Sequence, residues 1–309
     1  MSVSATAPIG QAFDHVKSML FQPFEARKWF VVGFSAFLAT LGSGGGSNFR
    51  VPDFGSGGSS GGDGSFESAL DWVRDNLQLI LVIGIAVLVV ALTLGLTFAW
   101  LSARGKFVFL DNVVRNEAAI KRPWREYAQE GNRLFVFNVV LGFGTLLVVA
   151  LSLTGAALIA WADIEARTLG TGAMVALGIA VLVVLPLLVL VAVINGVMQL
   201  WGIPLMYLRR VGAMAGLRAA FSEIVFPHLG SVIVFWLLLA LLGMGAALLG
   251  LLVILFTCCL GALPYINSVL MLPVTVLFRC LPLYFMEQIG QEFRIFNRLT
   301  ADEVVDVFR

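Results

Sequence analysis

The chain has 309 residues, of which 59% are hydrophobic and 13% are charged, and its mean hydropathy is +0.94. This balance excludes a water-soluble globular domain, because such domains carry about 25% charged residues. The formal net charge of +1 provides no global field that would attract nucleic acid, so we expect membrane lipids and not nucleic acid as partners.

The first segment, residues 1–28, lacks the basic, apolar and cleavage regions of a signal peptide. Phe13, Val16 and Leu20 recur at helical spacing, and polar residues occupy the other side. The segment is therefore predicted to form an amphipathic helix at the membrane interface.

Six apolar stretches are predicted to be transmembrane helices, because hydrocarbon leaves the backbone polar groups no partner outside the helix. The first has only 14 clearly apolar residues from Trp29 to Gly42, whereas a crossing needs about 20, so a re-entrant or interfacial segment is the alternative. We predict an all-α polytopic fold in one membrane domain, 1–309, with spans over residues 29–42, 77–101, 134–161, 171–203, 231–257 and 262–286.

The connections between these spans differ in composition. Residues 43–68 are rich in Gly and Ser and are predicted to form a flexible outer loop. Residues 102–133 and 204–230 are predicted to be cytoplasmic amphipathic segments, and the first of them is strongly basic. Residues 287–309 are predicted to be a cytoplasmic helical tail, with capping-box spacing at Thr300 and Glu303.

The distribution of cations predicts the orientation, since basic connections next to spans tend to stay in the cytoplasm. We therefore expect a multi-pass protein of the plasma membrane, such as a bacterial inner membrane, with both termini in the cytoplasm. Of the 20 Lys and Arg residues, all lie in the segments assigned to the cytoplasmic side except Arg50, Arg74, Arg167 and Arg279.

Three cytoplasmic segments have similar sequences just before odd-numbered spans. They contain Phe21-Gln22-Pro23-Phe24, Pro123-Trp124 and Phe226-Pro227-His228. Two explanations stay open. The chain could consist of three tandem units, each an interfacial helix followed by a helical hairpin, or amphipathic helices could have arisen independently before spans.

The opening motif contains Ala12-Phe13, Phe21-x-Pro23-Phe24 and Lys28-Trp29-Phe30, and a Gly/Ser-rich loop follows it. It resembles a group of uncharacterised bacterial and archaeal six-span proteins, which is similar to the membrane domain of some glycerophosphodiester phosphodiesterases. The resemblance covers about the first 60 residues and implies a fold. It implies no hydrolase activity, because a soluble phosphodiesterase domain is not present.

Polar residues inside the predicted spans are the candidate functional residues, because hydrocarbon penalises an unpaired polar group. Asn138, Asn195, Gln199 and Arg279 fall in the cytoplasmic third of their spans, and Asn267 lies outside that third. One interpretation is a cytoplasm-facing polar cavity in which Arg279 contacts an anion or a lipid headgroup. The other is that Arg279 extends to the interface and the amides join helices by hydrogen bonds.

Prolines are predicted to kink or break two of the spans, because each removes a backbone donor and clashes with the preceding turn. Pro186 lies near the middle of span four, and Pro264, Pro273 and Pro282 recur along span six. Broken helices line substrate paths in several transporters, although proline is also common in other membrane helices.

The sequence predicts no catalytic, metal or cofactor site. His15 and His228 are isolated, and no Asp or Glu lies within a predicted span to act as a base. We expect a non-catalytic membrane protein that organises lipid, preferentially anionic lipid at the cytoplasmic face, or that assembles with other membrane proteins or with itself. The alternative is a passive or lipid-type transporter that uses the kinked fourth and sixth spans.

Overall fold

The computed structural model describes residues 4, 6–41, 76–165, 170–257 and 263–296, and the regular secondary structure of these residues is entirely helical. The all-α fold class is therefore confirmed for this part of the chain. The predicted Gly/Ser loop over 43–68 and the end of the predicted tail, 297–309, lie outside the described residues.

The elements follow one another along the chain with short connections. They are α1 (Ala7–Phe21), α2 (Ala26–Thr40), α4 (Leu77–Arg115), α5 (Lys121–Glu126), α6 (Ala128–Ile159), α7 (Trp161–Glu165), α8 (Thr171–Val197), η1 (Met198–Gly202), α9 (Ile203–Arg209), α10 (Ala213–Ala219), η2 (Ala220–Val225), α11 (Leu229–Phe256), α12 (Pro264–Leu270), α13 (Leu272–Glu287) and η4 (Gln291–Phe293).

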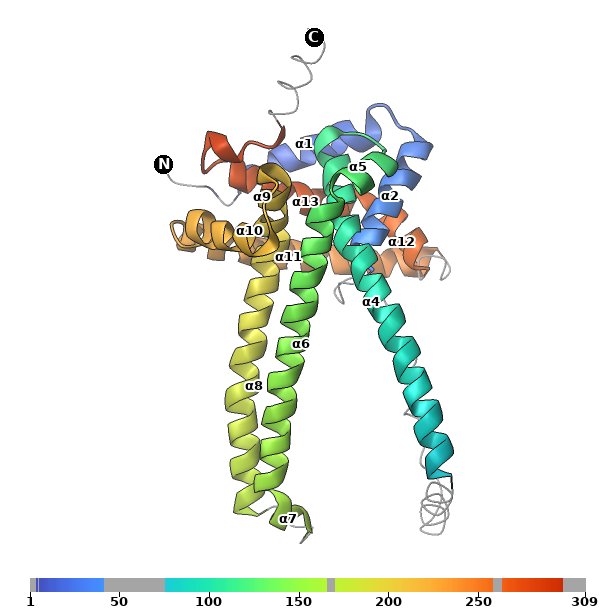
Figure 1. Cartoon of the computed structure of the whole chain (residues 1–309). Helices are drawn as coiled ribbons and strands as arrows, with labels where there is room; N and C mark the ends of the chain where they lie inside the picture. The colour runs from blue at the N-terminus through green and yellow to red at the C-terminus, as the bar shows by residue number, and fades with distance from the viewer. Residues whose placement is uncertain (1–3, 5, 42–75, 166–169, 258–262, 297–309) are drawn as a thin grey trace.

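Three long helices, α4, α6 and α8, project in the same general direction from one end of the molecule, and α7 lies at the far tip (Figure 1). From Leu77 to Phe98, apolar side chains are exposed on every side of α4. A helix that is apolar all round must be covered by protein or by lipid, and no described residue covers this part of α4. The projecting parts are therefore suited to hydrocarbon.

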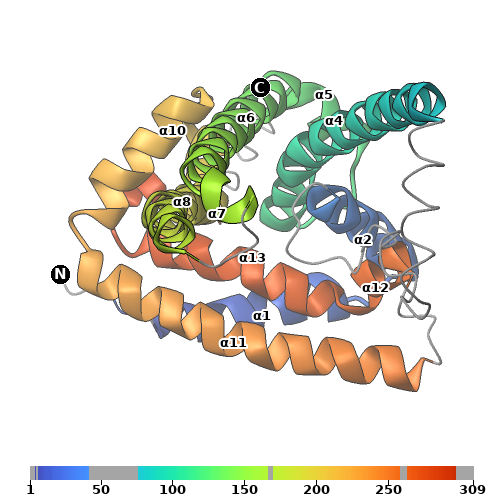
Figure 2. The same ribbon diagram turned by 90° about the horizontal axis from the view of Figure 1, so that it is seen from below.

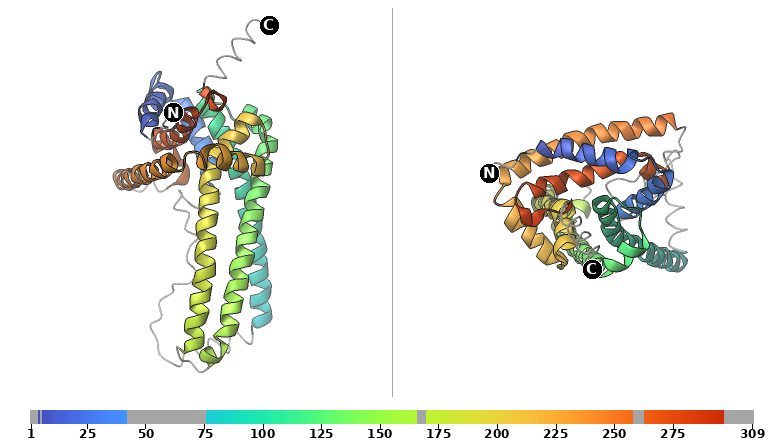
Figure 3. Two further views of the ribbon diagram at one scale, coloured as in Figure 1. Left: turned by 90° about the vertical axis from the view of Figure 1, so that its left-hand side faces the viewer. Right: turned by 90° about the horizontal axis from the view of Figure 1, so that it is seen from above.

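The other end of the molecule is a packed assembly of shorter elements, which we call the head (Figures 1 and 3). Its core includes the fully buried side chains of Trp201, Phe107, Phe235 and Phe285. Burying such large apolar groups is the main stabilising contribution available to the fold. The predicted cytoplasmic segments all contribute helices to the head, and so lie at one end of the molecule: α1 comes from 1–28, α5 from 102–133, and α9 and α10 from 204–230.

In the described part of the chain, four helices are long and apolar enough to cross a membrane, and the bent pair α12 and α13 would make a fifth if it is one broken span. The predicted first span forms α2, whose 15 residues are fewer than the roughly 20 needed for a crossing. A membrane-type fold with four to five candidate spans is therefore established. Six spans and tandem hairpin units stay predictions.

The helix that contains the second predicted span is longer than we expected, because α4 continues past residue 101 to Arg115. Phe107, Leu110 and Val113 maintain helical spacing and are fully buried in the head. Basic residues suggested a loop here, but the apolar face of the segment holds it in the core. The helix stops at Asn116, which adopts a left-handed conformation with φ of 56°.

The fifth and sixth predicted spans take a different direction from α4, α6 and α8. α11 lies across the long helices at the base of the head, roughly parallel to α1 and α13 (Figures 2 and 3). The sixth span is divided at Met271, where α12 and α13 meet at 67°. This arrangement brings α2, α4, α8 and α13 together at the level where the long helices enter the head.

Candidate functional site

The four polar residues selected from the sequence lie along two adjoining cavities at this level. The amide cavity, of about 440 Å³, lies between α4, α6 and α8 and is lined by Asn138, Asn195 and Gln199. The cation cavity, of about 250 Å³, lies between α2, α4, η1 and α13 and is lined by Gln199 and Arg279. Gln199 and Lys106 line both cavities, so the structure connects all four predicted residues.

Lys106 is the candidate that sequence reasoning missed. We counted it among the basic residues of the cytoplasmic segment, but only 8% of it is exposed. It shares one face of α4 with Ala99, Ser102 and Phe109, which also line the cavities. The signal was present in the sequence as a helical spacing that runs from the apolar span through Lys106 without interruption.

Arg279 is held by a carbonyl group that the backbone of η1 leaves open. The N–H of Ile203 donates to the carbonyl of Met198, as expected in a π-helical turn. The residue that would reach the carbonyl of Gln199 in the same register is Pro204, which has no N–H. Nη1 of Arg279 donates to this carbonyl instead, over 3.0 Å.

Lys106 and Arg279 bring two positive charges to the cation cavity and repel each other. Nε and Nη2 of Arg279 are buried without a hydrogen-bond partner. Among the described residues, neither Lys106 nor Arg279 forms an ion pair. Because a buried charge without a counter-charge is strongly unfavourable, this pair of residues favours a bound anion.

A second buried charge in the head is treated differently. Asp111 is fully buried on the same helix as Lys106, but its oxygens accept hydrogen bonds from Arg115 Nε at 3.1 Å, Arg122 Nη2 at 2.9 Å and the Tyr207 hydroxyl at 2.9 Å. This carboxylate therefore has the partners that the two cations lack. The comparison separates a structural charge from a candidate binding charge.

The amides do not act as links between helices in the described part of the chain. The side chains of Asn138, Asn195 and Gln199 form no hydrogen bond with another described residue, although all three line the amide cavity. The guanidinium group of Arg279 is turned inward to η1, and does not extend to the surface. This geometry corresponds to the polar-cavity interpretation of the sequence and not to the alternative.

The prolines act in two ways. Pro264 and Pro273 lie in the first turns of α12 and α13, where a missing N–H has no helical partner to lose. The break in span six falls at Met271, just before Pro273. By contrast, Pro186 and Pro282 lie inside α8 and α13, which continue past them.

No group of three or more His, Cys, Asp or Glu side chains in the described ranges could hold a metal ion. What the two cavities do offer is recognition chemistry: two cations, several amide groups and a surrounding apolar wall. Such a set of groups can hold an anion and exclude water from it.

Neither a curated protein nor a solved structure matches the chain. The comparisons show no link to glycerophosphodiester phosphodiesterases, so the resemblance of the opening motif stays an expectation. The model of a family described as a family of unknown function (DUF7544) matches residues 3–294, which is nearly the whole chain. The chain therefore belongs to this family of unknown function.

Proposed function

We propose that the protein is a non-catalytic membrane component that organises lipid by holding the phosphate of an anionic lipid headgroup in the cation cavity. The observation that carries this proposal is the burial of Lys106 and Arg279 in one cavity without a carboxylate. A phosphate would supply the missing negative charge and acceptor oxygens for Nε and Nη2 of Arg279.

An aromatic and cationic cluster beside the amide cavity supports a lipid as the source of the phosphate. The guanidinium carbon of Arg104 lies 4.5 Å from the ring centre of Trp100 and 5.3 Å from that of Trp124. Trp and Arg gather where membrane meets water, so this cluster suggests the depth of the interface. In the proposed six-span topology, with both termini in the cytoplasm of a cell bounded by this plasma membrane, that interface belongs to the inner leaflet.

Retention of lipid by the purified full chain tests the proposal. We would reconstitute the protein with equal amounts of phosphatidylglycerol and phosphatidylcholine, extract it in mild detergent and measure bound lipid by native mass spectrometry. The double variant Lys106→Gln/Arg279→Gln is expected to retain roughly a hundredfold less phosphatidylglycerol, since two charge-assisted contacts are worth about 3 kcal/mol.

The matched control is Lys121→Gln/Arg125→Gln, which removes two exposed cations of α5 and should retain lipid normally. Gel filtration and circular dichroism establish that both variants are folded. Equal retention by the two double variants would refute the proposal. Binding of inorganic phosphate with no retained phospholipid would also refute it, because the cavity would then serve a soluble anion.

A lipid-type transporter is the second candidate function, and the division of the sixth predicted span supports it. The 67° bend between α12 and α13 lies close to the cavities, and η1 interrupts the regular helix that leads from α8 to α9. Interruptions of this kind accompany substrate paths in transporters. Protein-dependent movement of fluorescent phosphatidylglycerol between the leaflets of vesicles, abolished by Arg279→Gln, would favour transport over static binding.

A further inference from the structure

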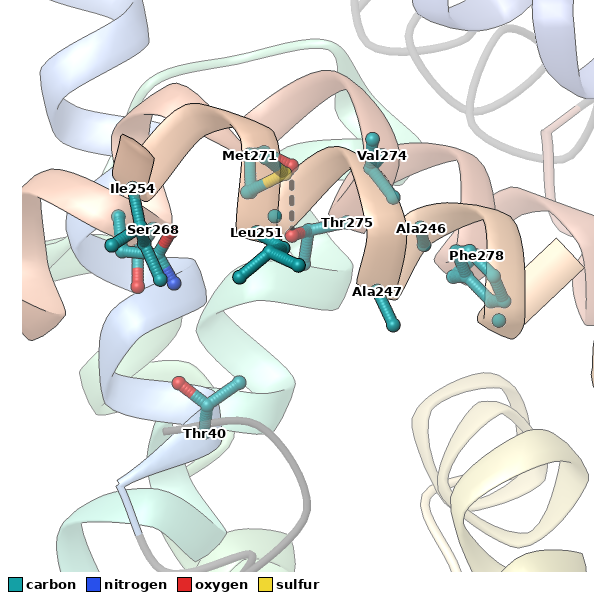
Figure 4. A pocket seen from close by; sticks show the side chains of 13 residues that line it. Thr40, Ala246, Ala247, Leu251, Ile254, Ser268, Met271, Val274, Thr275 and Phe278 are labelled. Atoms are coloured by element: carbon teal, nitrogen blue, oxygen red, sulfur yellow. Dashed lines mark hydrogen bonds between the residues drawn. The ribbon is translucent and has the colours of Figure 1, made fainter. Parts of the chain in front are cut away.

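A larger cavity, of about 680 Å³, lies between α11 and the bent α12–α13 pair, and we call it the α11 cavity (Figure 4). It shares three lining residues, Thr40, Thr275 and Phe278, with the cation cavity, so the two cavities adjoin. One molecule could therefore extend from Lys106 and Arg279 into the α11 cavity.

The α11 cavity exists because one face of α11 changes from large to small residues. The first half of this face packs on the core, and the second half leaves space opposite α12 and α13. A Cβ atom added to Gly243 or Gly250 would meet no heavy atom within 4 Å. The large residues are Val232, Phe235, Leu239 and Leu242, and the small ones that continue the spacing are Gly243, Ala246, Ala247 and Gly250.

The wall of the α11 cavity is apolar in its effective chemistry. The hydroxyl of Thr275 donates to the carbonyl of Met271 over 3.0 Å, as the dashed line in Figure 4 marks. Thr40 and Ser268 donate to carbonyls of their own helices in the same way. These hydroxyls are therefore not needed by a ligand, and the remaining wall consists mostly of aliphatic groups, Met and Phe. A water-filled cavity would need more polar partners than such a wall supplies.

We infer that the α11 cavity receives a fatty-acyl chain of the same anionic lipid whose phosphate is bound by Lys106 and Arg279. This inference rests on the proposed function and names its ligand class: an intact long-chain anionic phospholipid, and not a headgroup alone. The two adjoining cavities provide a cationic end and an apolar end in series, as such a lipid requires. The surrounding bilayer supplies this ligand directly to the exposed face of α11.

Photo-crosslinking of the full chain tests where the chain lies. A phosphatidylglycerol with a diazirine group in the middle of one acyl chain is expected to label residues 243–254 or 264–278. The variant Gly243→Phe/Gly250→Phe fills the cavity and should lose this labelling. Its control, Gly245→Phe/Leu252→Phe, places two rings on α11 at positions that do not line the cavity, and should keep it.

Asn267 provides an independent arm, because its Oδ1 is buried in the cavity region without a partner. Asn267→Leu should retain the crosslink, since an acyl chain loses nothing when an amide is replaced by a similar apolar group. Loss of the crosslink in this folded variant would indicate a polar ligand and would overturn the inference.

A short-chain lipid separates this inference from the proposed function. Dihexanoyl phosphatidylglycerol should bind equally to the wild type and to the cavity-filling variant, but weakly to Lys106→Gln/Arg279→Gln. Crosslinks confined to α4 and α6, unchanged by Gly243→Phe/Gly250→Phe, would refute the acyl-chain site and leave the headgroup site intact. Undiminished dihexanoyl binding by Lys106→Gln/Arg279→Gln would refute both.

Discussion

At the scale of single residues, Asp111 is the charge on which the head depends most. It is fully buried and accepts hydrogen bonds from Arg115, Arg122 and Tyr207. Asp111→Asn removes the negative charge and leaves the cations unbalanced, so we expect the free energy of unfolding to fall by about 3 kcal/mol. Thermal unfolding of the purified protein in detergent measures the change.

Glu117 is the matched control for this prediction. It pairs with the same Arg122 at 2.8 Å, but its side chain is 39% exposed. Exposed ion pairs contribute little, so Glu117→Gln should cost less than about 1 kcal/mol. If the two variants unfold at the same temperature, burial of Asp111 does not determine the stability of the cluster.

His15 makes the stability of the head dependent on pH. Its Nε2 lies 3.0 Å from the Val113 carbonyl and its Nδ1 lies 3.3 Å from the Tyr284 hydroxyl, so the neutral ring can donate to the first and accept from the second. Burial is the main cause that lowers the pKa of His15 below its ordinary value of about 6.5, and repulsion by Lys28 adds to it.

The sign of the effect follows from the lowered pKa. Below about pH 6.5 the unfolded chain takes up a proton that the folded chain resists, so stability should be constant above this pH and fall as the pH decreases. Thermal unfolding at pH 8 and pH 5 measures the difference. His15→Gln keeps a donor and an acceptor, and should reduce this pH dependence; an unchanged dependence would contradict the assignment.

Sequence position alone identified Asn138, Asn195, Gln199 and Arg279, because a polar residue inside an apolar stretch is visible without coordinates. It could not identify Pro204, since the vacant carbonyl of Gln199 depends on the π-helical register of η1. The side chains that face a cavity are fixed by where helices from distant parts of the chain meet, and hydropathy carries no record of that.

At the scale of elements, the closest backbone approach involves α2 and α4. A Cβ on Gly105 would lie 2.7 Å from the backbone carbonyl carbon of Leu38. Gly105→Ala should therefore force the helices apart and lower the free energy of unfolding by about 1–3 kcal/mol, despite the better helix propensity of alanine.

Gly95 on the same helix is the control, because a Cβ there would meet nothing within 4 Å. Gly95→Ala should leave stability unchanged or raise it by up to about 1 kcal/mol. Thermal unfolding in detergent compares the two variants. Equal effects would show that α2 and α4 are not in close contact in the membrane protein.

The existence of most apolar helices could be predicted from the sequence, because their length and composition are set by hydrocarbon. Their ends and directions could not. α4 extends to Arg115 because Phe107 and Leu110 find a core that is built mainly by other segments. α11 is apolar all round, so its composition gives no preferred face, and its direction across the long helices depends on tertiary packing.

At the scale of the whole molecule, the cationic segments 102–133 and 204–230 and helix α1 share the head, whereas α7 lies at the opposite tip (Figure 1). The structure contains no membrane, so the side on which the head lies is decided by the charge argument alone. That argument places the head in the cytoplasm and α7 outside.

Cysteine labelling in whole cells checks this orientation. In a background with Cys258, Cys259 and Cys280 replaced by alanine, Glu165→Cys should react with a membrane-impermeant maleimide added outside, because Glu165 is exposed on α7. Arg125→Cys, exposed on α5, should react only after the membrane is permeabilised. Reaction of Arg125→Cys in intact cells would invert the topology. The cation cavity lies where the long helices enter the head, so the same result would move its lipid from the inner leaflet to the outer one.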